Sequence, residues 1–323
     1  MNRKLTKSLA RIFGVVFAIV CFAWLLVAQP TTHTQPPSQA TVAPDRLKAH
    51  VQVLSETFHP RNWQNTQNLD RCAAYITRHF IQAGARVSEQ AYKFGDRQYR
   101  NVIGKFGSDT DQRLVIGAHY DTCENTPGAD DNASGVAALI ELGYLLGQQP
   151  SNPAIELVAY TLEEPPFFRT AQMGSAMHAN MLATQKIPVR GVIVFEMVGY
   201  YRDEPWTQSY PALLLHLMYP SRGNFVGVIG RWDQGDWIKK IKMGMKGTTP
   251  LPVYSIRAPA ALPGVDFSDH LNYWSQGFQA VMLTDTAFYR NEAYHGTNDI
   301  PNRLDYTRLG NVVIATFETI KHL

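Results

Sequence analysis

Residues 113–164 read RLVIGAHYDTCENTPGADDNASGVAALIELGYLLGQQPSNPAIELVAYTLEE. The apolar run over 113–119 predicts a buried strand, the apolar residues over 133–147 predict a helix, and the run over 154–162 predicts a second buried strand. A strand, a helix and another strand in this order are typical of a parallel crossover unit. The stretch therefore predicts helices packed against a largely parallel sheet.

The same alternation continues on both sides of this stretch. We therefore expect one α/β domain over residues 44–323, a three-layer αβα domain with a mixed, largely parallel central sheet. Further strands are expected at 86–94, 99–106, 189–197 and 280–286, and further helices at 47–58, 69–83, 174–185, 233–246, 268–276 and 304–322.

Acidic residues and histidines interrupt the apolar runs at the ends of the expected strands. In open parallel sheets, the residues that follow the carboxyl ends of the strands meet at one edge, where ligands bind. Four strands bring such side chains to this edge, namely His119 with Asp121, Glu163 with Glu164, Glu196, and His295 in a following loop.

Each of these residues also has a structural explanation when it is taken alone. His119 fits a hydrogen-bonded core histidine, and the Glu163–Glu164 pair fits a solvated strand end. Asp130 and Asp131 precede the expected helix, so we expect Asp131 or Asn132 to cap its N-terminus and Asp130 to face the site. The coincidence of all these residues at one edge favours a metal site.

The kinds of ligand indicate which metal is bound. Imidazoles mixed with carboxylates, without a thiolate, suit Zn²⁺ or a similar ion better than Ca²⁺ or an iron–sulfur cluster. Two histidines and three carboxylates exceed the needs of one tetrahedral zinc. With one bridging carboxylate they suffice for two ions about 3.5–4 Å apart.

The N-terminus reads as an export signal. Arg3, Lys4, Lys7 and Arg11 precede an apolar run over residues 12–28. The basic residues predict that this end stays in the cytoplasm and that the rest of the chain lies outside it, in the periplasm or the extracellular space. We interpret residues 1–28 as a membrane anchor in preference to a cleaved signal peptide, which would release the protein.

The remaining composition limits the class of protein. Without the four basic residues of the N-terminus, 26 basic residues face 27 acidic ones, so no basic stripe suggests a nucleic-acid partner. The uncharged, proline-rich residues 29–43 are expected to form a flexible linker. An oxidising compartment would permit a Cys72–Cys123 disulfide, and the sequence leaves this pairing open.

Several motifs resemble the dizinc aminopeptidases, a family related to glutaminyl cyclases and to the protease-like domain of the transferrin receptor. The paired acids and the PGADDNASG segment are the most specific of them. The matching segments are GAHYDT (117–122), PGADDNASGVAALIEL (127–142), EE (163–164), MGSAMHA (173–179), FEMVGY (195–200), SDHLNYW (268–274) and YHGTNDIPNRLDY (294–306).

The resemblance implies a role for each expected metal ligand. Asp130 matches the carboxylate that bridges the two zinc ions. His119 and Glu196 would complete one zinc site, and Glu164 and His295 would complete the other. The family usually has aspartate in place of Glu196. The extra methylene of Glu196 displaces its carboxylate, so the resemblance predicts zinc at the His119/Glu196 site less firmly than at the other site.

The resemblance also implies the catalytic groups. Glu163 matches the general base of the family, and Asp121 matches the acid that orients His119. A non-proline cis peptide is expected between Asp130 and Asp131. Asp269 and His270 are candidates for the wall of the substrate pocket, although a helix cap and a packed histidine explain them equally well.

The function implied is an exported zinc exopeptidase that hydrolyses the first peptide bond of substrates with a free N-terminus. A one-zinc glutaminyl cyclase and a non-catalytic binding ectodomain are the alternatives. The sequence retains all five expected ligands and the expected base, which favours the enzyme over the ectodomain.

Overall fold

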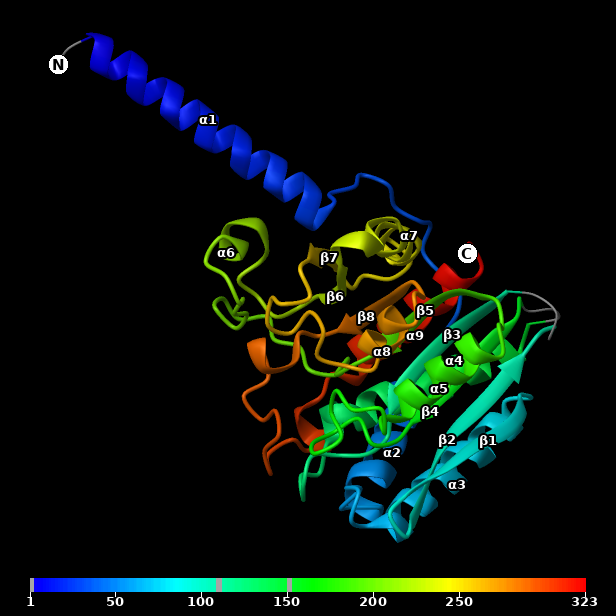
Figure 1. Ribbon diagram of the computed structural model, residues 1–323. Helices are drawn as coiled ribbons and strands as arrows, with labels where there is room; N and C mark the ends of the chain where they lie inside the picture. The colour runs from blue at the N-terminus through cyan, green and yellow to red at the C-terminus, as the bar shows by residue number, and fades with distance from the viewer. Residues whose placement is uncertain (1–2, 109–111, 150–152) are drawn as a thin grey trace.

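A computed structural model describes residues 3–108, 112–149 and 153–323 (Figure 1). The described residues form one eight-stranded sheet in the order β1-β2-β4-β3-β5-β8-β6-β7. The strands are β1 (Arg86–Phe94), β2 (Arg97–Phe106), β3 (Arg113–His119), β4 (Ile155–Tyr160), β5 (Val189–Phe195), β6 (Val226–Arg231), β7 (Val253–Ala258) and β8 (Ala280–Thr284).

The centre of the sheet is parallel, as the sequence predicts. Strand β3 pairs in parallel with β4 and with β5, and β5 pairs in parallel with β8. The β1–β2 hairpin adds to β4 in the antiparallel sense, and β6 runs antiparallel to β8. The carboxyl ends of β3, β4, β5 and β8 therefore lie along one edge.

Helices cover both faces of the sheet. Leu114 and Ile116 of β3 pack into the larger hydrophobic core, whereas Val115 packs into the core on the other face. This alternation follows from the two-residue period of a strand. The larger core contains residues of α2 (Pro44–Gln52), α3 (Thr66–Gln82), α4 (Gly135–Gly147), α7 (Gly235–Met245) and α9 (Tyr306–Ile320), and the smaller core contains residues of α5 (Gly174–Thr184) and α8 (His270–Ser275).

The six strands and the seven helices predicted outside the N-terminus are confirmed within a few residues, the helix expected at 47–58 being α2 and the π-helical turn Val53–Thr57 that follows it, but β6 and β7 were not predicted. Gly227 and Gly230 interrupt the apolar pattern of β6. Gly230 is required by packing, because a Cβ at this position would lie 2.8 Å from the Ile238 side chain of α7. The two strands are thus identified by their neighbours in space and not by their own sequence pattern.

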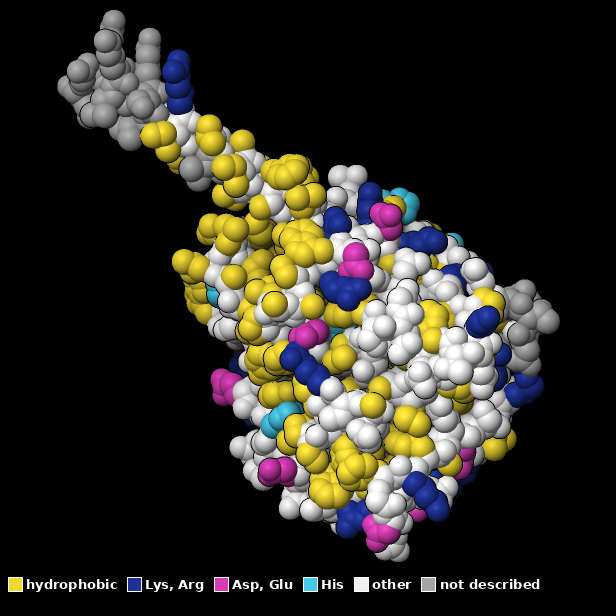
Figure 2. All heavy atoms as spheres, in the orientation of Figure 1, with side chains coloured by type: hydrophobic (Ala, Val, Ile, Leu, Met, Phe, Trp, Pro, Cys, Tyr) yellow, Lys and Arg dark blue, Asp and Glu magenta, His cyan; other side chains and the backbone are white. Residues whose placement is uncertain are grey.

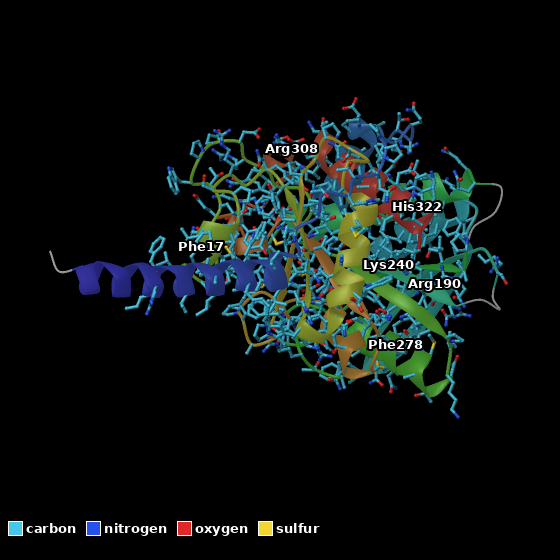
Figure 3. All side chains as sticks on the ribbon, turned by 90° about the horizontal axis from the view of Figure 1, so that it is seen from above. Phe17, Arg190, Lys240, Phe278, Arg308 and His322 are labelled. Atoms are coloured by element: carbon cyan, nitrogen blue, oxygen red, sulfur yellow. The ribbon has the colours of Figure 1, made fainter. Side chains whose placement is uncertain are left out.

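Helix α1 (Arg3–Ala28) projects from the domain (Figures 1 and 3). Its segment Arg11–Ala28 has a mean hydropathy of 2.4, and the Phe17 side chain is exposed. Beside its C-terminal end lies α6 (Leu215–Met218), and both Leu217 of this helix and Leu213, which precedes it, are mostly exposed. Hydrophobic side chains therefore form a surface that continues from α1 onto this part of the domain (Figure 2).

Residues 29–43 contain no helix or strand, but they are attached to the domain along their length. Lys242 of α7 donates a hydrogen bond to the Ala28 carbonyl at 2.8 Å and another to that of Gln29. The Gln35 amide donates to the Lys246 carbonyl at 2.7 Å, and the Ser38 amide donates to that of Thr248 at 2.8 Å. The segment is therefore a strap on the domain surface, where a flexible linker was expected.

The structure has no bond between Cys72 and Cys123, both of which are free thiols. Cys72 is buried in the larger core on α3, and burial raises the pKa of its thiol to about 12. Cys123 is partly exposed in the loop that follows β3. The disulfide that the sequence left open is therefore absent.

Candidate metal centre

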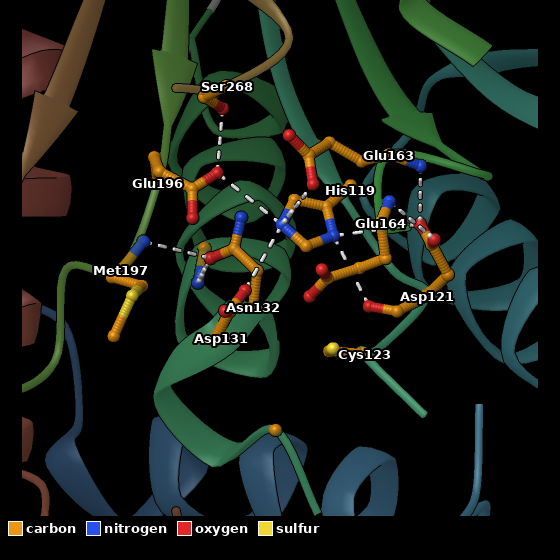
Figure 4. Close-up of polar contacts among 12 residues, drawn as sticks. His119, Asp121, Cys123, Asp131, Asn132, Glu163, Glu164, Glu196, Met197 and Ser268 are labelled. Carbon is orange, nitrogen blue, oxygen red and sulfur yellow. Dashed lines mark hydrogen bonds and ion pairs between the residues drawn. The ribbon is translucent and has the colours of Figure 1, made fainter. Parts of the chain in front are cut away.

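His119, the last residue of β3, is fully buried and has two distinct ring nitrogens (Figure 4). Its Nδ1 lies 3.2 Å from the backbone oxygen of Asp121 and 3.6 Å from the carboxylate of the same residue. A proton on Nδ1 satisfies these acceptors and leaves the lone pair of Nε2 free. Nε2 is buried and has no hydrogen-bond partner among the described residues, so it is available to a metal ion.

Asp121 also positions the paired acids that follow β4. Its two carboxylate oxygens accept hydrogen bonds from the backbone amides of Glu163 and Glu164, each at 3.1 Å. The Asp121 carboxylate thus connects the end of β3 to the loop after β4. This arrangement agrees with the orienting role that the resemblance implies for Asp121.

Asp131 lies between the two histidines. One carboxylate oxygen is 3.3 Å from His119 Nε2, and the other is 3.2 Å from His295 Nε2. Glu196 Oε2 lies 3.4 Å from His119 Nε2, and Glu164 Oε2 lies 3.2 Å from His295 Nε2. One carboxylate therefore faces two groups, each of which contains a histidine and a second carboxylate.

The prediction that Asp130 faces the two histidines is wrong. Its carboxylate accepts hydrogen bonds from the Gly199 amide at 3.0 Å and from the Asn291 side chain at 2.9 Å. The backbone departs from helical geometry at Asp131 and Asn132, so the side chains of the two aspartates point in different directions. The cis peptide joins Asp131 to Asn132, one bond later than expected.

Asn132, one of the two expected caps, holds this turn in place. Its Oδ1 accepts hydrogen bonds from the Gly135 amide at the start of α4 and from the Met197 amide, and its Nδ2 donates to the Phe195 carbonyl. Asp131 is therefore free of the capping role. Asn132 connects the start of α4 to the end of β5, beside Glu196.

Glu196 reaches His119 although its side chain is longer than the usual aspartate. Its Oε2 accepts a hydrogen bond of 2.6 Å from the Ser268 hydroxyl, which fixes the carboxylate. Glu163 lies on the opposite side of His119, with its Oε2 3.9 Å from Nε2. Glu163 is therefore beside the centre without being among its closest contacts.

Left-handed backbone conformations turn these side chains toward the centre. Leu162, Met197 and His295 have φ angles of 58°, 48° and 53°. Such angles are unfavourable for residues with a side chain and persist where the surroundings enforce them. Each of the three is a metal-ligand candidate or lies within two residues of one in the sequence, so the strained positions coincide with the site.

The electrostatics of the site favour the binding of a cation. Although burial opposes it, the imidazoles of His119 and His295 hold the pKa of Asp131 below its ordinary value. Burial, with Asp131 close by, raises the pKa of Glu164 to about 7, and burial also raises the pKa of Glu163 and of Glu196. No ion pair found among the described residues joins these carboxylates to a lysine or arginine.

Divalent ions suit this donor set. They would neutralise the excess of buried carboxylates. They would also occupy the free valences of His119 Nε2 and Glu164 Oε1, a buried oxygen that lacks a partner among the described residues. Imidazole and carboxylate ligands together favour zinc.

An apolar pocket adjoins the centre. Glu196 and Tyr294 are among the residues that line it, and the Tyr294 ring stacks on that of His295 with 3.8 Å between centroids. Aromatic and aliphatic side chains from the region of α6 and from β6, β7 and β8 line the rest of the pocket. Tyr210 and Tyr219 are among them, whereas Trp206 is 84% exposed.

Asp269 and His270 are not among the residues that line this pocket. Both are fully buried. His270 shares a hydrogen bond of 2.8 Å with the Val265 carbonyl and packs edge-on against Trp274, and burial lowers its pKa to about 4. The structural explanation of His270 as a packed histidine therefore holds.

Two residues of the site were missed by sequence reasoning. Asp299 accepts hydrogen bonds from the backbone amides of Asp130 and Asp131, at 2.9 and 3.0 Å, and so holds the distorted turn. The thiol of Cys123 lies within 4.8 Å of ligand atoms of Glu164 and His295. The position of Cys123, four residues after His119, was the available signal. From the sequence, Cys123 was expected only as a possible disulfide partner of Cys72.

Comparisons with known proteins find a matching family and several relatives. Residues 101–320 match Peptidase family M28. The uncharacterized protein YfbL of Escherichia coli is 42% identical over 312 residues, which cover 93% of this chain and 96% of the relative. Leucine aminopeptidase 1 of Metarhizium robertsii is 24% identical over 81% of this chain and 65% of its own length.

Two solved structures show the same fold. The LapA aminopeptidase of Legionella pneumophila has a TM-score of 0.68 at 20% identity, over 86% of this chain and 71% of the other. A glutaminyl cyclase of Bacteroides thetaiotaomicron, bound to N-acetylhistamine, has a TM-score of 0.67 at 20% identity, over 88% of this chain and 99% of the cyclase.

Proposed function

The chain belongs to Peptidase family M28, and from this premise we propose that it is a zinc-dependent aminopeptidase. The observation that carries the proposal is the position of Asp131 between His119 and His295. Glu196 accompanies the first histidine and Glu164 the second, so two ions would each have a histidine, a carboxylate and a share of Asp131.

When bound, zinc lowers the pKa of water and polarises the scissile carbonyl. Glu163 accepts a proton from the attacking water and donates it to the leaving amine, as general base and then general acid. The raised pKa of Glu163 and its position beside His119 suit this exchange. Asp121 keeps both Glu163 and His119 oriented through its contacts with each.

The apolar pocket accepts the side chain of the N-terminal residue. Its lining is mostly aromatic and aliphatic, and it includes Glu196 of the metal centre and Tyr294, which stacks on His295. Burial of an apolar side chain there stabilises binding by about 25 cal/mol per Å² of apolar area. Leucyl and phenylalanyl substrates are therefore expected to be cleaved faster than glutamyl or lysyl ones.

The purified full-length protein tests the proposal. We expect about two zinc ions per chain, hydrolysis of leucyl anilide, and loss of this activity after chelation with recovery on adding zinc. A peptide with N-terminal glutamine distinguishes the alternative, because a glutaminyl cyclase would release ammonia from it and leave the anilide intact. Full activity after complete removal of metal would refute the proposal.

Glu163→Gln is a direct test of the general base. The amide cannot accept the proton, so we expect kcat to fall by about 10²–10⁴-fold while the zinc content stays the same. Metal analysis and steady-state kinetics on the same sample measure both quantities. Near-normal kcat in this variant would remove Glu163 from the mechanism.

We also propose that α1 remains as a membrane anchor and that the domain lies outside the cytoplasm. The basic residues before the apolar run support this orientation. The exposed Leu213 and Leu217, beside the C-terminal end of α1, extend the apolar surface in a manner suited to lipid. Intact mass of the membrane-extracted protein distinguishes the anchor from a cleaved signal.

A further inference from the structure

Cys123 lies next to one half of the centre. Its Sγ, a carboxylate oxygen of Glu164 and a ring nitrogen of His295 all lie within 4.8 Å of one another. In Figure 4 the sulfur lies close to the Glu164 carboxylate. Because Cys123 forms no disulfide, its thiol is free to bind a ligand.

Glu164 provides a second, independent indication of a ligand at this position. Its side chain is only 4% exposed, and its Oε1 has no hydrogen-bond partner among the described residues. An unpaired carboxylate oxygen in such a place costs free energy unless a cation or a donor satisfies it. A metal ion that contacts this oxygen would lie within reach of the thiol.

The dimensions suit zinc. Zinc forms bonds of about 2.3 Å to thiolate sulfur and about 2.0–2.2 Å to imidazole nitrogen and carboxylate oxygen. Small movements of the three side chains bring their ligand atoms to these distances. Cys123 is partly exposed in the loop that follows β3.

We propose that the thiolate of Cys123 is a further ligand of the ion held by His295, Glu164 and Asp131. The proposal rests on the metal centre of the proposed function. When the sulfur–metal bond forms, the thiol proton is released to solvent, and no oxidation takes place. One half of the centre then has a soft ligand, whereas the half that contains His119 and Glu196 has only nitrogen and oxygen ligands.

The soft ligand has two consequences. Thiolates select zinc over magnesium or manganese, so this half of the centre discriminates between metals more strongly than the other half. Bound metal also shields the sulfur, so Cys123 reacts with alkylating reagents in the metal-free protein and is protected when zinc is present. Cys72, which is buried in the core, is unreactive in both states.

Cobalt substitution tests the proposal with a readout that does not depend on activity. The full-length protein is stripped of metal and loaded with Co²⁺. A sulfur-to-cobalt charge-transfer band in the near ultraviolet is expected in the native protein and in Cys21→Ser/Cys72→Ser, whose only thiol is Cys123. The band is expected to disappear in Cys123→Ser and in Cys123→Ala.

The binding constant of the second ion is the other readout. We expect the Kd of the ion held by His295 and Glu164 to rise at least about tenfold in Cys123→Ser. The Kd of the ion held by His119 and Glu196 should stay the same. Two bound cobalt ions without a charge-transfer band in the native protein would overturn the ligand role of Cys123 and leave the aminopeptidase proposal standing. Failure to bind cobalt at all would overturn both.

Discussion

At the scale of single residues, the two neighbouring aspartates have different tasks. Asp131 faces both histidines, whereas Asp130 supports the backbone of Gly199 and the side chain of Asn291. The resemblance assigns the bridging role to Asp130, and the structure gives that position to Asp131. The choice depends on backbone angles at Asp131 that are set by contacts from distant parts of the chain, including Asp299.

The pair Asp131→Asn and Asp130→Asn tests this division. Asp131→Asn removes the shared carboxylate, so we expect loss of zinc and a fall in kcat/KM of at least about 10²-fold. In Asp130→Asn we expect the zinc content to stay at about two and the free energy of unfolding to fall by about 1–3 kcal/mol.

Metal analysis and urea unfolding of both variants distinguish the roles. Burial, together with Asp285, raises the pKa of Asp130 well above its ordinary value, so its amide analogue resembles the protonated form. Loss of zinc from Asp130→Asn with retention in Asp131→Asn would reverse the assignment.

At the scale of elements, the strands that carry the site were predicted and two of the strands that form the pocket were not. β3, β4, β5 and β8 are continuous apolar runs, because both of their faces are buried in the middle of the sheet. β6 and β7 lie toward the edge, and β6 contains two glycines, so their local pattern is weak. The metal centre could therefore be located from the sequence, whereas the pocket beside it could not.

The strap of residues 29–43 gives a prediction at the same scale. Lys242 donates to the carbonyls of Ala28 and Gln29 from a largely buried position on α7. In Lys242→Ala the Gln29 carbonyl loses this donor and the Ala28 carbonyl keeps the Ser255 hydroxyl, and we expect limited proteolysis within residues 29–43 to become several-fold faster. Lys240→Ala, on the exposed side of α7, is the control and should leave the rate unchanged (Figure 3). Equal rates in the two variants would show that the strap is held by its other contacts.

At the scale of the whole molecule, stability should depend on metal and pH together. The pKa of Glu164 is raised to about 7 in the metal-free fold. The buried carboxyl therefore lowers the free energy of unfolding little while it is protonated. As the pH rises from the ordinary pKa of a glutamate through about 7, this loss of stability grows. The nearby carboxylates raise the pKa of His119 and His295 against the effect of burial, so these ligands also lose protons only at higher pH. Zinc binds the deprotonated ligands and therefore stabilises the fold more at high pH.

We therefore expect the zinc-induced rise in Tm to be larger at about pH 8 than at about pH 5.5. Thermal unfolding of the zinc-loaded and chelated protein at the two pH values measures the difference. Asp131→Asn, which is expected to lack zinc, should show almost no rise at either pH. A larger zinc effect at the lower pH would contradict the proton release expected for these ligands.

The attachment of residues 29–43 along α7 also limits where the enzyme can work. A domain on a flexible linker would reach a wide volume and change its orientation relative to the bilayer. Here Gln35 and Ser38 are hydrogen-bonded to the surface that follows α7, so hardly any slack remains between the last turn of α1 and the folded body. If α1 stays in a membrane, as proposed above, the pocket is held at a fixed distance from the bilayer, and we expect it to bind peptides close to the lipid surface in preference to those far from it.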